Sequence, residues 1–98
     1  MQILFSDKAE EDLIKITEYT IDTWGFKQAD KYNLDIENAY KTIQENPFHP
    51  LSKSKENILK DLRSFNVGKH AIFYRILNKK SVEIIRILHL SMDLKRHF

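Results

Sequence analysis

The clearest structural pattern in the chain is LRSFNVGKHAIFYRIL, residues 62–77. Apolar and polar residues alternate on both sides of Gly68-Lys69, which is the pattern of two half-buried strands joined by a tight turn. Gly68 suits the turn because glycine reaches positive φ without a steric cost. A two-residue turn fixes the following pairs: Val67 with His70, Phe65 with Ile72 and Arg63 with Tyr74. The segment therefore predicts a β-hairpin of defined register.

A third antiparallel strand is predicted over Val82–His89, after a four-residue turn at Asn78–Ser81. This turn would pair Leu77 with Val82, Arg75 with Ile84 and Phe73 with Arg86. Side chains alternate across a sheet, so one face becomes apolar enough to receive helices: Phe65, Val67, Ile72, Tyr74, Ile76, Ile85 and Ile87. The other face would hold Ser64, Ala71, Phe73, Arg75, Leu77, Ile84, Arg86 and Leu88.

The first half of the chain predicts a short strand and two helices. Met1–Phe5 reads as the strand, and Ser6 is a good N-cap for a helix that ends near Trp24. Its core stripe is expected to be Ala9, Leu13, Ile16, Thr20 and Trp24, with Ile14 and Ile21 beside it. After Gly25, a second helix is predicted over Lys27–Glu45. Its core face is expected to be Ala29, Tyr32, Ile36, Ala39, Tyr40 and Ile43, with Leu34 on the far side.

These elements predict one α+β domain over residues 1–98, in the order β-α-α-β-β-β, with a helical hairpin on one face of a small antiparallel sheet. The segment Phe48–Lys60 is expected to be a long loop. The chain has no Cys, which excludes disulfide scaffolds and cysteine nucleophiles. No apolar run approaches the length of a membrane span, and the acidic N-terminus does not resemble a signal peptide, so we expect a cytoplasmic protein.

Two pairs of side chains on the predicted sheet invite functional readings. Arg75 and Arg86 would be diagonal neighbours on adjacent strands, and together they would suit the binding of a phosphate or carboxylate. Alternatively, each arginine would pair with a local acid such as Glu83 or Asp93. His70 and His89 would face each other, as an acid–base pair or as ordinary hydrogen-bonded side chains. No third His or carboxylate has metal-ligand spacing, so we expect no metal and no cofactor.

The whole chain resembles the ParE-type toxins of the ParE/RelE superfamily. The matching pieces, in order, are Ser6-x-x-Ala9-x-x-Asp12-Leu13-x-x-Ile16, Tyr19-Thr20, Trp24-Gly25, Gln28-Ala29, Asn46-Pro47, Leu62-Arg63-Ser64-Phe65, Val67-Gly68-x-His70-x-Ile72-Phe73-Tyr74-Arg75-Ile76 and Arg86-Ile87-Leu88-His89-x-x-Met92-Asp93. The segment Phe48–Asp61 departs from the family, because relatives often place a Gly soon after the Asn-Pro and this chain has Pro50-Leu51 there.

The resemblance implies the toxin of a type II toxin–antitoxin pair. ParE-like members typically act on DNA gyrase, and RelE-like members cut messenger RNA in the ribosome. If the chain were such a ribonuclease, Arg63, Arg75 and Arg86 would supply charge and His89 would supply acid–base catalysis. No Tyr follows Tyr74, so the set of ribonuclease groups that the resemblance implies is incomplete. We therefore favour a non-catalytic gyrase inhibitor, which would have no catalytic residues. A toxin that keeps only antitoxin binding is a third possibility.

The resemblance also implies two binding surfaces. We expect the target to be bound by the basic tail and the neighbouring sheet: Arg75, Arg86, Lys95, Arg96 and His97. A cognate, ParD-like antitoxin is expected to lay apolar anchors on Leu34, Phe73, Leu77, Ile84 and Leu88, which the predicted register leaves uncovered, and to form a hetero-oligomer with the toxin.

Overall fold

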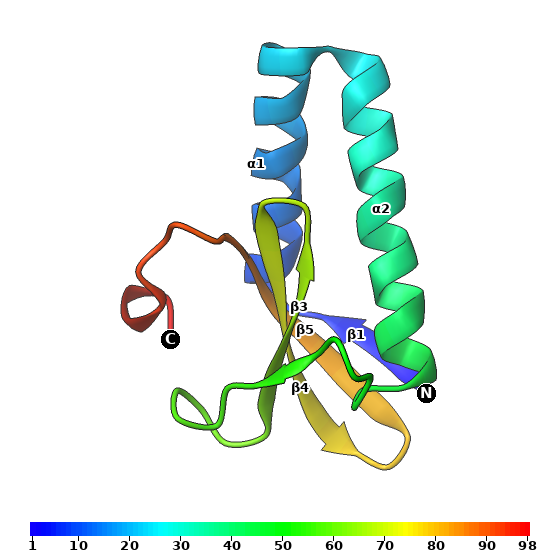
Figure 1. Ribbon diagram of the computed structural model, residues 1–98, viewed down its shortest axis with the longest axis vertical. Helices are drawn as coiled ribbons and strands as arrows, with labels where there is room; N and C mark the ends of the chain where they lie inside the picture. Colours follow the sequence, from blue (N-terminus) through cyan, green and yellow to red (C-terminus); the bar gives the residue numbers. More distant parts are fainter.

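Two helices pack on one face of a five-stranded sheet in the computed structural model, which describes all residues, 1–98 (Figure 1). The elements are β1 (Gln2–Phe5), α1 (Asp7–Trp24), α2 (Phe26–Glu45), β2 (Lys53–Ser54), β3 (Leu62–Val67), β4 (His70–Asn78), β5 (Ser81–His89) and a 3-10 helix η1 (Leu94–Arg96). The strand order is β1-β5-β4-β3-β2, with β1 parallel to β5 and the other pairs antiparallel. The predicted α+β class and element order are confirmed.

The structure differs from the prediction in two respects at the level of whole elements. The segment expected to be a loop contains β2, which pairs with β3 at the sheet edge. The sheet is also not purely antiparallel, because β1 joins the edge of β5 in parallel. No helix combines the length and the apolar character that crossing a membrane requires.

Local signals set the ends of both helices. The backbone N–H of Ala9 donates a 3.0 Å hydrogen bond to Ser6 Oγ, so Ser6 caps α1 as expected. Gly25 adopts φ 90° and ψ 171°, a conformation essentially restricted to glycine, and α2 begins at the next residue. Asn46 is extended before Pro47, which ends α2. The short link makes α1 and α2 an antiparallel hairpin.

The main core lies between the helices and the sheet. Its buried members are Ala9, Ile16, Ile36, Ala39, Ile43, Val67, Ile72, Tyr74, Val82, Ile84 and Ile87. The predicted helix stripes are confirmed except at two positions: Trp24 is 69% exposed and Ile14 is 57% exposed. Trp24 lacks cover because the tip of the hairpin extends past the strands (Figure 1). Ile14 lies on the side of α1 turned away from the sheet, roughly opposite Ile16 on the helix circumference.

The register of β4 against β5 corrects the prediction over a short stretch. The turn is the two residues Lys79-Lys80, since Asn78 pairs with Ser81. Two irregularities, at Leu77 and at Ile85, shift the intervening pairs by one residue, so Tyr74 lies opposite Ile84 and Arg75 opposite Glu83. A shift of one residue exchanges the faces of a strand. Ile84 therefore faces the helices, and Ile85, which was expected there, packs on the other face.

The face turned away from the helices has an apolar cluster of its own. Leu62, Ala71, Phe73 and Leu88 are buried there, and Ile58, Ile85 and Leu94 pack against them. The ring of Phe98 meets that of Phe73 edge-on, with 5.1 Å between centroids. The expectation that Phe73, Ile84 and Leu88 are uncovered is therefore wrong: each is at most 1% exposed. The loop before β3 and the C-terminal segment cover the cluster, and the main core encloses Ile84.

Tyr32 ties α2 to the β3–β4 turn. Its hydroxyl donates a hydrogen bond of 3.0 Å to the Val67 carbonyl oxygen and lies 2.6 Å from His70 Nδ1. Gly68 has φ 54°, and a Cβ placed on it would stand 2.7 Å from Tyr32 Cε1. Glycine is required at position 68 for two reasons: the Tyr32 ring occupies the space of a side chain, and the backbone φ is positive.

We expect Gly68→Ala to lower the free energy of unfolding by about 1–3 kcal/mol, since the methyl group must displace the Tyr32 ring at a strained φ. Chemical denaturation measures the effect. The matched background is Tyr32→Ala, in which the ring is absent and Gly68→Ala should cost clearly less. Additive costs of the two substitutions would contradict the steric explanation.

Candidate functional site

Arg86 is held in an ion pair with a carboxylate from α1. Its Nε lies 2.8 Å from Asp12 Oδ2 and its Nη2 lies 2.8 Å from Asp12 Oδ1, a two-point contact between largely buried side chains. The hydrogen bonds to Asp12 raise the pKa of Arg86. The sequence left two interpretations of Arg86 open, ligand binding and pairing with an acid. The structure shows pairing with an acid, and the partner is Asp12 instead of Glu83 or Asp93. Arg86 serves the fold, which limits its role as a target contact.

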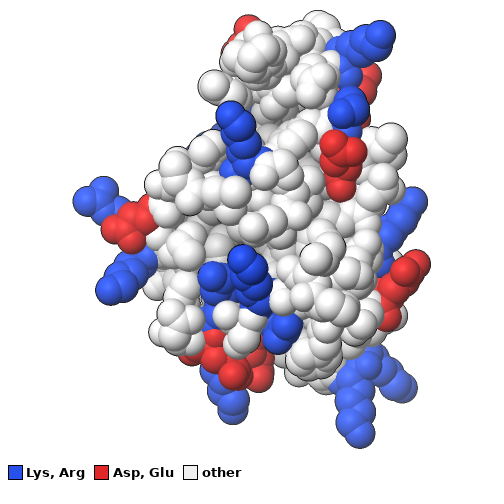
Figure 2. All heavy atoms as spheres, in the orientation of Figure 1, with Lys and Arg blue, Asp and Glu red and all other residues white.

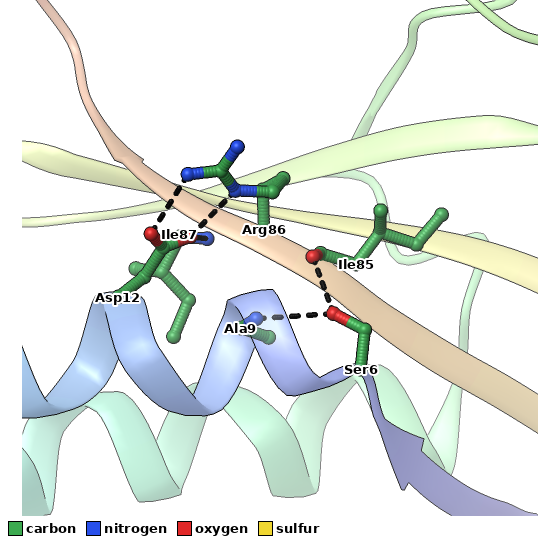
Figure 3. A network of polar contacts seen from close by, with 6 residues as sticks. All are labelled: Ser6, Ala9, Asp12, Ile85, Arg86 and Ile87. Carbon is green, nitrogen blue, oxygen red and sulfur yellow. Dashed lines mark hydrogen bonds and ion pairs between the residues drawn. The ribbon is translucent and has the colours of Figure 1, made fainter. Parts of the chain in front are cut away.

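The ion pair belongs to a network that attaches α1 to β5 (Figure 3). The Ile87 backbone N–H donates to Asp12 Oδ2 at 3.0 Å, and Ser6 Oγ donates to the Ile85 carbonyl oxygen at 2.6 Å. Asp12 was not singled out as a site residue. Its position supplied a signal, because it follows Ala9 by three residues and precedes Ile16 by four, which places it on the buried face of α1.

Arg63 and Tyr74 also have structural partners. The Nε and Nη2 atoms of Arg63 donate to Ser52 Oγ at 3.1 and 2.8 Å, and its guanidinium lies over the Phe48 ring, 5.1 Å from the centroid. Tyr74 is fully buried and its hydroxyl donates to the Pro47 carbonyl oxygen. Arg63 thus fastens the segment after α2 to the sheet, and Tyr74 has no access to a ligand.

The other residues predicted to bind the target form fewer contacts within the chain. Arg75 is half-buried opposite Glu83, with no ion pair within 4.0 Å. Lys95 and Arg96 are exposed on η1, and Arg96 has only a 4.0 Å contact with Asp93 between exposed side chains. Such surface pairs contribute little. The positive charges of this tail are therefore available to a partner.

Two basic side chains, Lys53 on β2 and Lys55 just after it, line a pocket that the sequence interpretation missed. The pocket, of 220 Å³, brings Lys53 and Lys55 together with Ser64, Asn66 and His89, beside Phe73 and Leu94. The sequence offered one signal: Lys53 and Lys55 are two residues apart, a spacing that places both on one side of an extended segment. The short β2 gave no stronger indication.

His70 and His89 face each other across β4 and β5, as predicted, with ring centroids 5.3 Å apart. His89 Nδ1 accepts a 3.1 Å hydrogen bond from the Ser91 backbone N–H. Burial, and to a smaller extent the nearby His89, lower the pKa of His70. No three His, Cys, Asp or Glu side chains lie close enough together to hold a metal ion.

Comparison with known proteins identifies the family. Residues 3–94 match the family model described as the ParE toxin of type II toxin-antitoxin system, parDE. The chain belongs to the ParE toxin family. It is 30% identical over 94 residues to Toxin ParE1 of Mycobacterium tuberculosis, covering 96% of this chain and 94% of the relative. It is 35% identical over 92 residues to Toxin ParE1 of Caulobacter vibrioides, covering 94% and 92%. The chain is thus a toxin of a type II toxin–antitoxin system.

Solved structures share the fold of this ParE-family toxin. A chain of the chromosomal ParDE toxin–antitoxin system from P. aeruginosa superposes with a TM-score of 0.76 at 22% identity, over 91% of this chain and 95% of that one. A chain of the toxin–antitoxin complex RelBE2 from Mycobacterium tuberculosis gives 0.64 at 21% identity, over 90% and 95%. The ParE/RelE fold inferred from the sequence is confirmed, and the departure at Phe48–Asp61 leaves the family unchanged.

Asp12→Ala is expected to destabilise this ParE-family toxin by about 3–5 kcal/mol, because it leaves Arg86 largely buried without its partner. It also removes the acceptor for the Ile87 N–H. Thermal and chemical unfolding measure the loss. Glu11→Ala, at an exposed neighbouring position on the same helix, is the control and should change stability by less than about 0.5 kcal/mol. Equal effects of the two substitutions would show that the ion pair does not hold α1 to β5.

Proposed function

We propose that this ParE-family toxin inhibits DNA gyrase without cleaving a substrate, and that a cognate antitoxin neutralises it. The observation that carries the first part is that the four residues suggested for a ribonuclease do not all converge: Arg86 and His89 line one pocket, and neither Arg63 nor Arg75 lines it. Arg63 is bonded to Ser52 and Arg86 to Asp12, which leaves Arg75 and His89.

Arg75 and His89 lie too far apart to act on one phosphate. His89 lies opposite His70, and Arg75 follows His70 by five residues on β4. At about 3.3 Å per residue of strand, the two positions are separated by about 16 Å along the sheet. A transition state needs its charge-stabilising and acid–base groups within hydrogen-bond reach of the same reacting atoms. The geometry therefore favours the non-enzymatic function.

The target surface proposed for this toxin is the basic tail with the adjoining sheet. Lys95 and Arg96 are exposed, and Arg75 has no ion pair. At the left edge of Figure 2, where the C-terminal segment lies in Figure 1, Lys and Arg side chains project beside an acidic one, although the net charge is only +2. Local clusters of one sign steer association even when the net charge is small. Arg86 no longer belongs to this set, because two of its three guanidinium nitrogens are bonded to Asp12.

Purified toxin should inhibit the supercoiling activity of gyrase and cause cleaved DNA to accumulate. The double variant Lys95→Glu with Arg96→Glu should weaken inhibition about tenfold or more, because it reverses two exposed charges. The control Lys8→Glu with Lys41→Glu makes the same charge change on the helices. Absence of inhibition by the unaltered toxin would refute the gyrase function, and equal losses in the two double variants would refute the assigned surface.

A second candidate function, a ribosome-dependent endoribonuclease, is favoured by one observation. Lys53, Lys55 and His89 line the same pocket, which combines cationic groups with one imidazole. Primer extension on translated messages distinguishes the two functions. Cuts in the ribosomal A site that disappear in Lys55→Ala or His89→Gln would support the ribonuclease, whereas intact messages with arrested DNA replication support gyrase inhibition.

Only accessible side chains of the toxin can contact the antitoxin. Of the five expected anchors, Leu34 is 53% exposed and Leu77 is 44% exposed. Leu34 lies opposite Ile36 on the circumference of α2, and the exposed Ile14 occupies the equivalent outward position on α1. The outer side of the hairpin therefore offers apolar groups on both helices. The named relatives belong to toxin–antitoxin pairs, which supports an antitoxin as the occupant.

Leu34→Glu should weaken binding of the antitoxin by more than tenfold, because an apolar anchor contributes about 1.5–3 kcal/mol when it is buried. Calorimetric titration with the antitoxin measures the change. Lys53→Glu, on β2, is the control and should have a small effect on antitoxin binding. For the unaltered toxin, raised salt should slow association without abolishing the complex. Leu88→Glu is unsuitable because Leu88 is buried. Equal losses for Leu34→Glu and Lys53→Glu would contradict the assignment.

A further inference from the structure

A pocket of 170 Å³ lies where α1, the ends of β4 and β5 and the C-terminal segment meet, apart from the pocket beside β2. Five of the side chains that line it are basic: Lys15, His70, Arg86, His89 and His97. Asp12 is the one carboxylate in the lining, and its oxygens are occupied by Arg86 and the Ile87 N–H. The pocket therefore presents an excess of hydrogen-bond donors over acceptors.

Several of these donors have no partner within the chain. The ion pair with Asp12 uses Nε and Nη2 of Arg86, and the third nitrogen, Nη1, points away from the carboxylate (Figure 3). Lys15 forms no ion pair. Lys15 is exposed and no side-chain nitrogen of the protein is both fully buried and unpaired, so these donors face the open pocket, where an anion can accept hydrogen bonds from several of them at once.

The two histidines are held with one ring nitrogen engaged and the other available. His70 Nδ1 lies 2.6 Å from the Tyr32 hydroxyl, and His89 Nδ1 accepts from the Ser91 backbone N–H at 3.1 Å. Because His89 Nδ1 is an acceptor, the proton of the neutral ring is on Nε2. Neither Nε2 has a hydrogen-bond partner in the structure. Tyr32 and Ser91 thus act as positioning residues for two imidazoles that line the pocket.

We infer that the pocket lined by Lys15, His70, Arg86 and His89 binds a phosphate group. A phosphate accepts hydrogen bonds on several oxygens arranged around one centre, which matches donors from Lys15 on α1 and from Arg86 and His89 on β5. The Tyr32 hydroxyl donates to Val67, so the neutral His70 ring carries its proton on Nδ1, and its Nε2 becomes a further donor when the ring is protonated. A carboxylate has only two oxygens and fits such a set less well. A metal ion is not the ligand, because the donors are cationic and no three potential metal ligands lie together. This inference does not rest on the proposed gyrase function.

Binding should be coupled to protonation of His70. The charged and titratable groups that face His70 are Tyr32 from α2, His89 from β5, and the pocket groups Asp12, Lys15, Arg86 and His97. Burial and His89 lower the pKa of His70 in the ligand-free protein, so His70 is predominantly neutral at about pH 7. A phosphate stabilises the protonated ring and raises that pKa again. Affinity for the phosphate dianion should therefore rise as the pH falls, by up to about tenfold per pH unit while His70 takes up its proton.

The test follows the ring signals of His70 and His89 by NMR while inorganic phosphate is added at about pH 6 and about pH 8. We expect both rings to shift on addition of phosphate, and tighter binding at the lower pH when the affinity is expressed for the phosphate dianion. Lys15→Gln should weaken binding several-fold, and so should His89→Gln. Lys8→Gln, at an exposed position on the same helix outside the pocket, should leave binding unchanged.

Two further probes define the ligand. A 5′-phosphorylated trinucleotide that binds more tightly than its unphosphorylated form would assign the phosphate to a nucleic-acid terminus, whereas binding of inorganic phosphate alone would assign a free ion. Acetate serves as the carboxylate probe. Overturning results are the absence of ring shifts with phosphate at about pH 6, equal binding by Lys15→Gln and Lys8→Gln, or acetate binding as tightly as phosphate.

Discussion

The attachment of α1 to the edge of β5 is the constraint on which the rest of the structure depends. β1 pairs with only the first part of β5, from Ser81 to Ile84. Beyond that point the side chains at the start of α1 replace a strand: Ser6 donates to the Ile85 carbonyl oxygen, and Asp12 accepts from the Ile87 N–H. Each of these backbone groups would cost about 1–3 kcal/mol if it were buried without a partner. The helix therefore completes the hydrogen bonding of the sheet as well as covering its core.

This attachment also determines which charges are left for function. Arg86 lies on the strand that α1 completes, and two of its nitrogens are committed to Asp12. The family resemblance alone would count Arg86 with Arg63 and Arg75 as charges for a substrate. The contacts separate them, because Arg63 and Arg86 hold a loop and a helix in place while Arg75 has no ion pair. Basic residues of a toxin of this fold thus have to be assigned by their partners, not by residue type.

Most of the fold could be predicted from the sequence because its signals are local. The 3.6-residue spacing of Ala9, Ile16 and Thr20, the glycine at position 25 and the Gly68-Lys69 turn each act within a few neighbouring residues. The register of β4 and β5 could not be predicted over its middle part. The adjacent apolar residues Ile84 and Ile85 fit either face, and the irregularity at Ile85 coincides with a hydrogen bond from Ser6, which is 79 residues away. A hydrogen bond between residues so far apart in the sequence cannot be predicted from the local alternation of apolar and polar residues.

The candidate site was predicted less well for the same reason. Sequence alternation placed Phe73 and Leu88 correctly on the face away from the helices, but it gave no information about what covers that face. Ile58 and Leu94, from a loop and from the C-terminal segment, bury the centre of it. Both faces of the sheet are therefore covered, and the accessible groups lie around its margin: the cations of η1, Lys53 on β2 and the outer side of the helical hairpin. With the target on η1 and the antitoxin on the helical hairpin, as proposed above, the two partners would occupy separate margins and would not compete for a single apolar face.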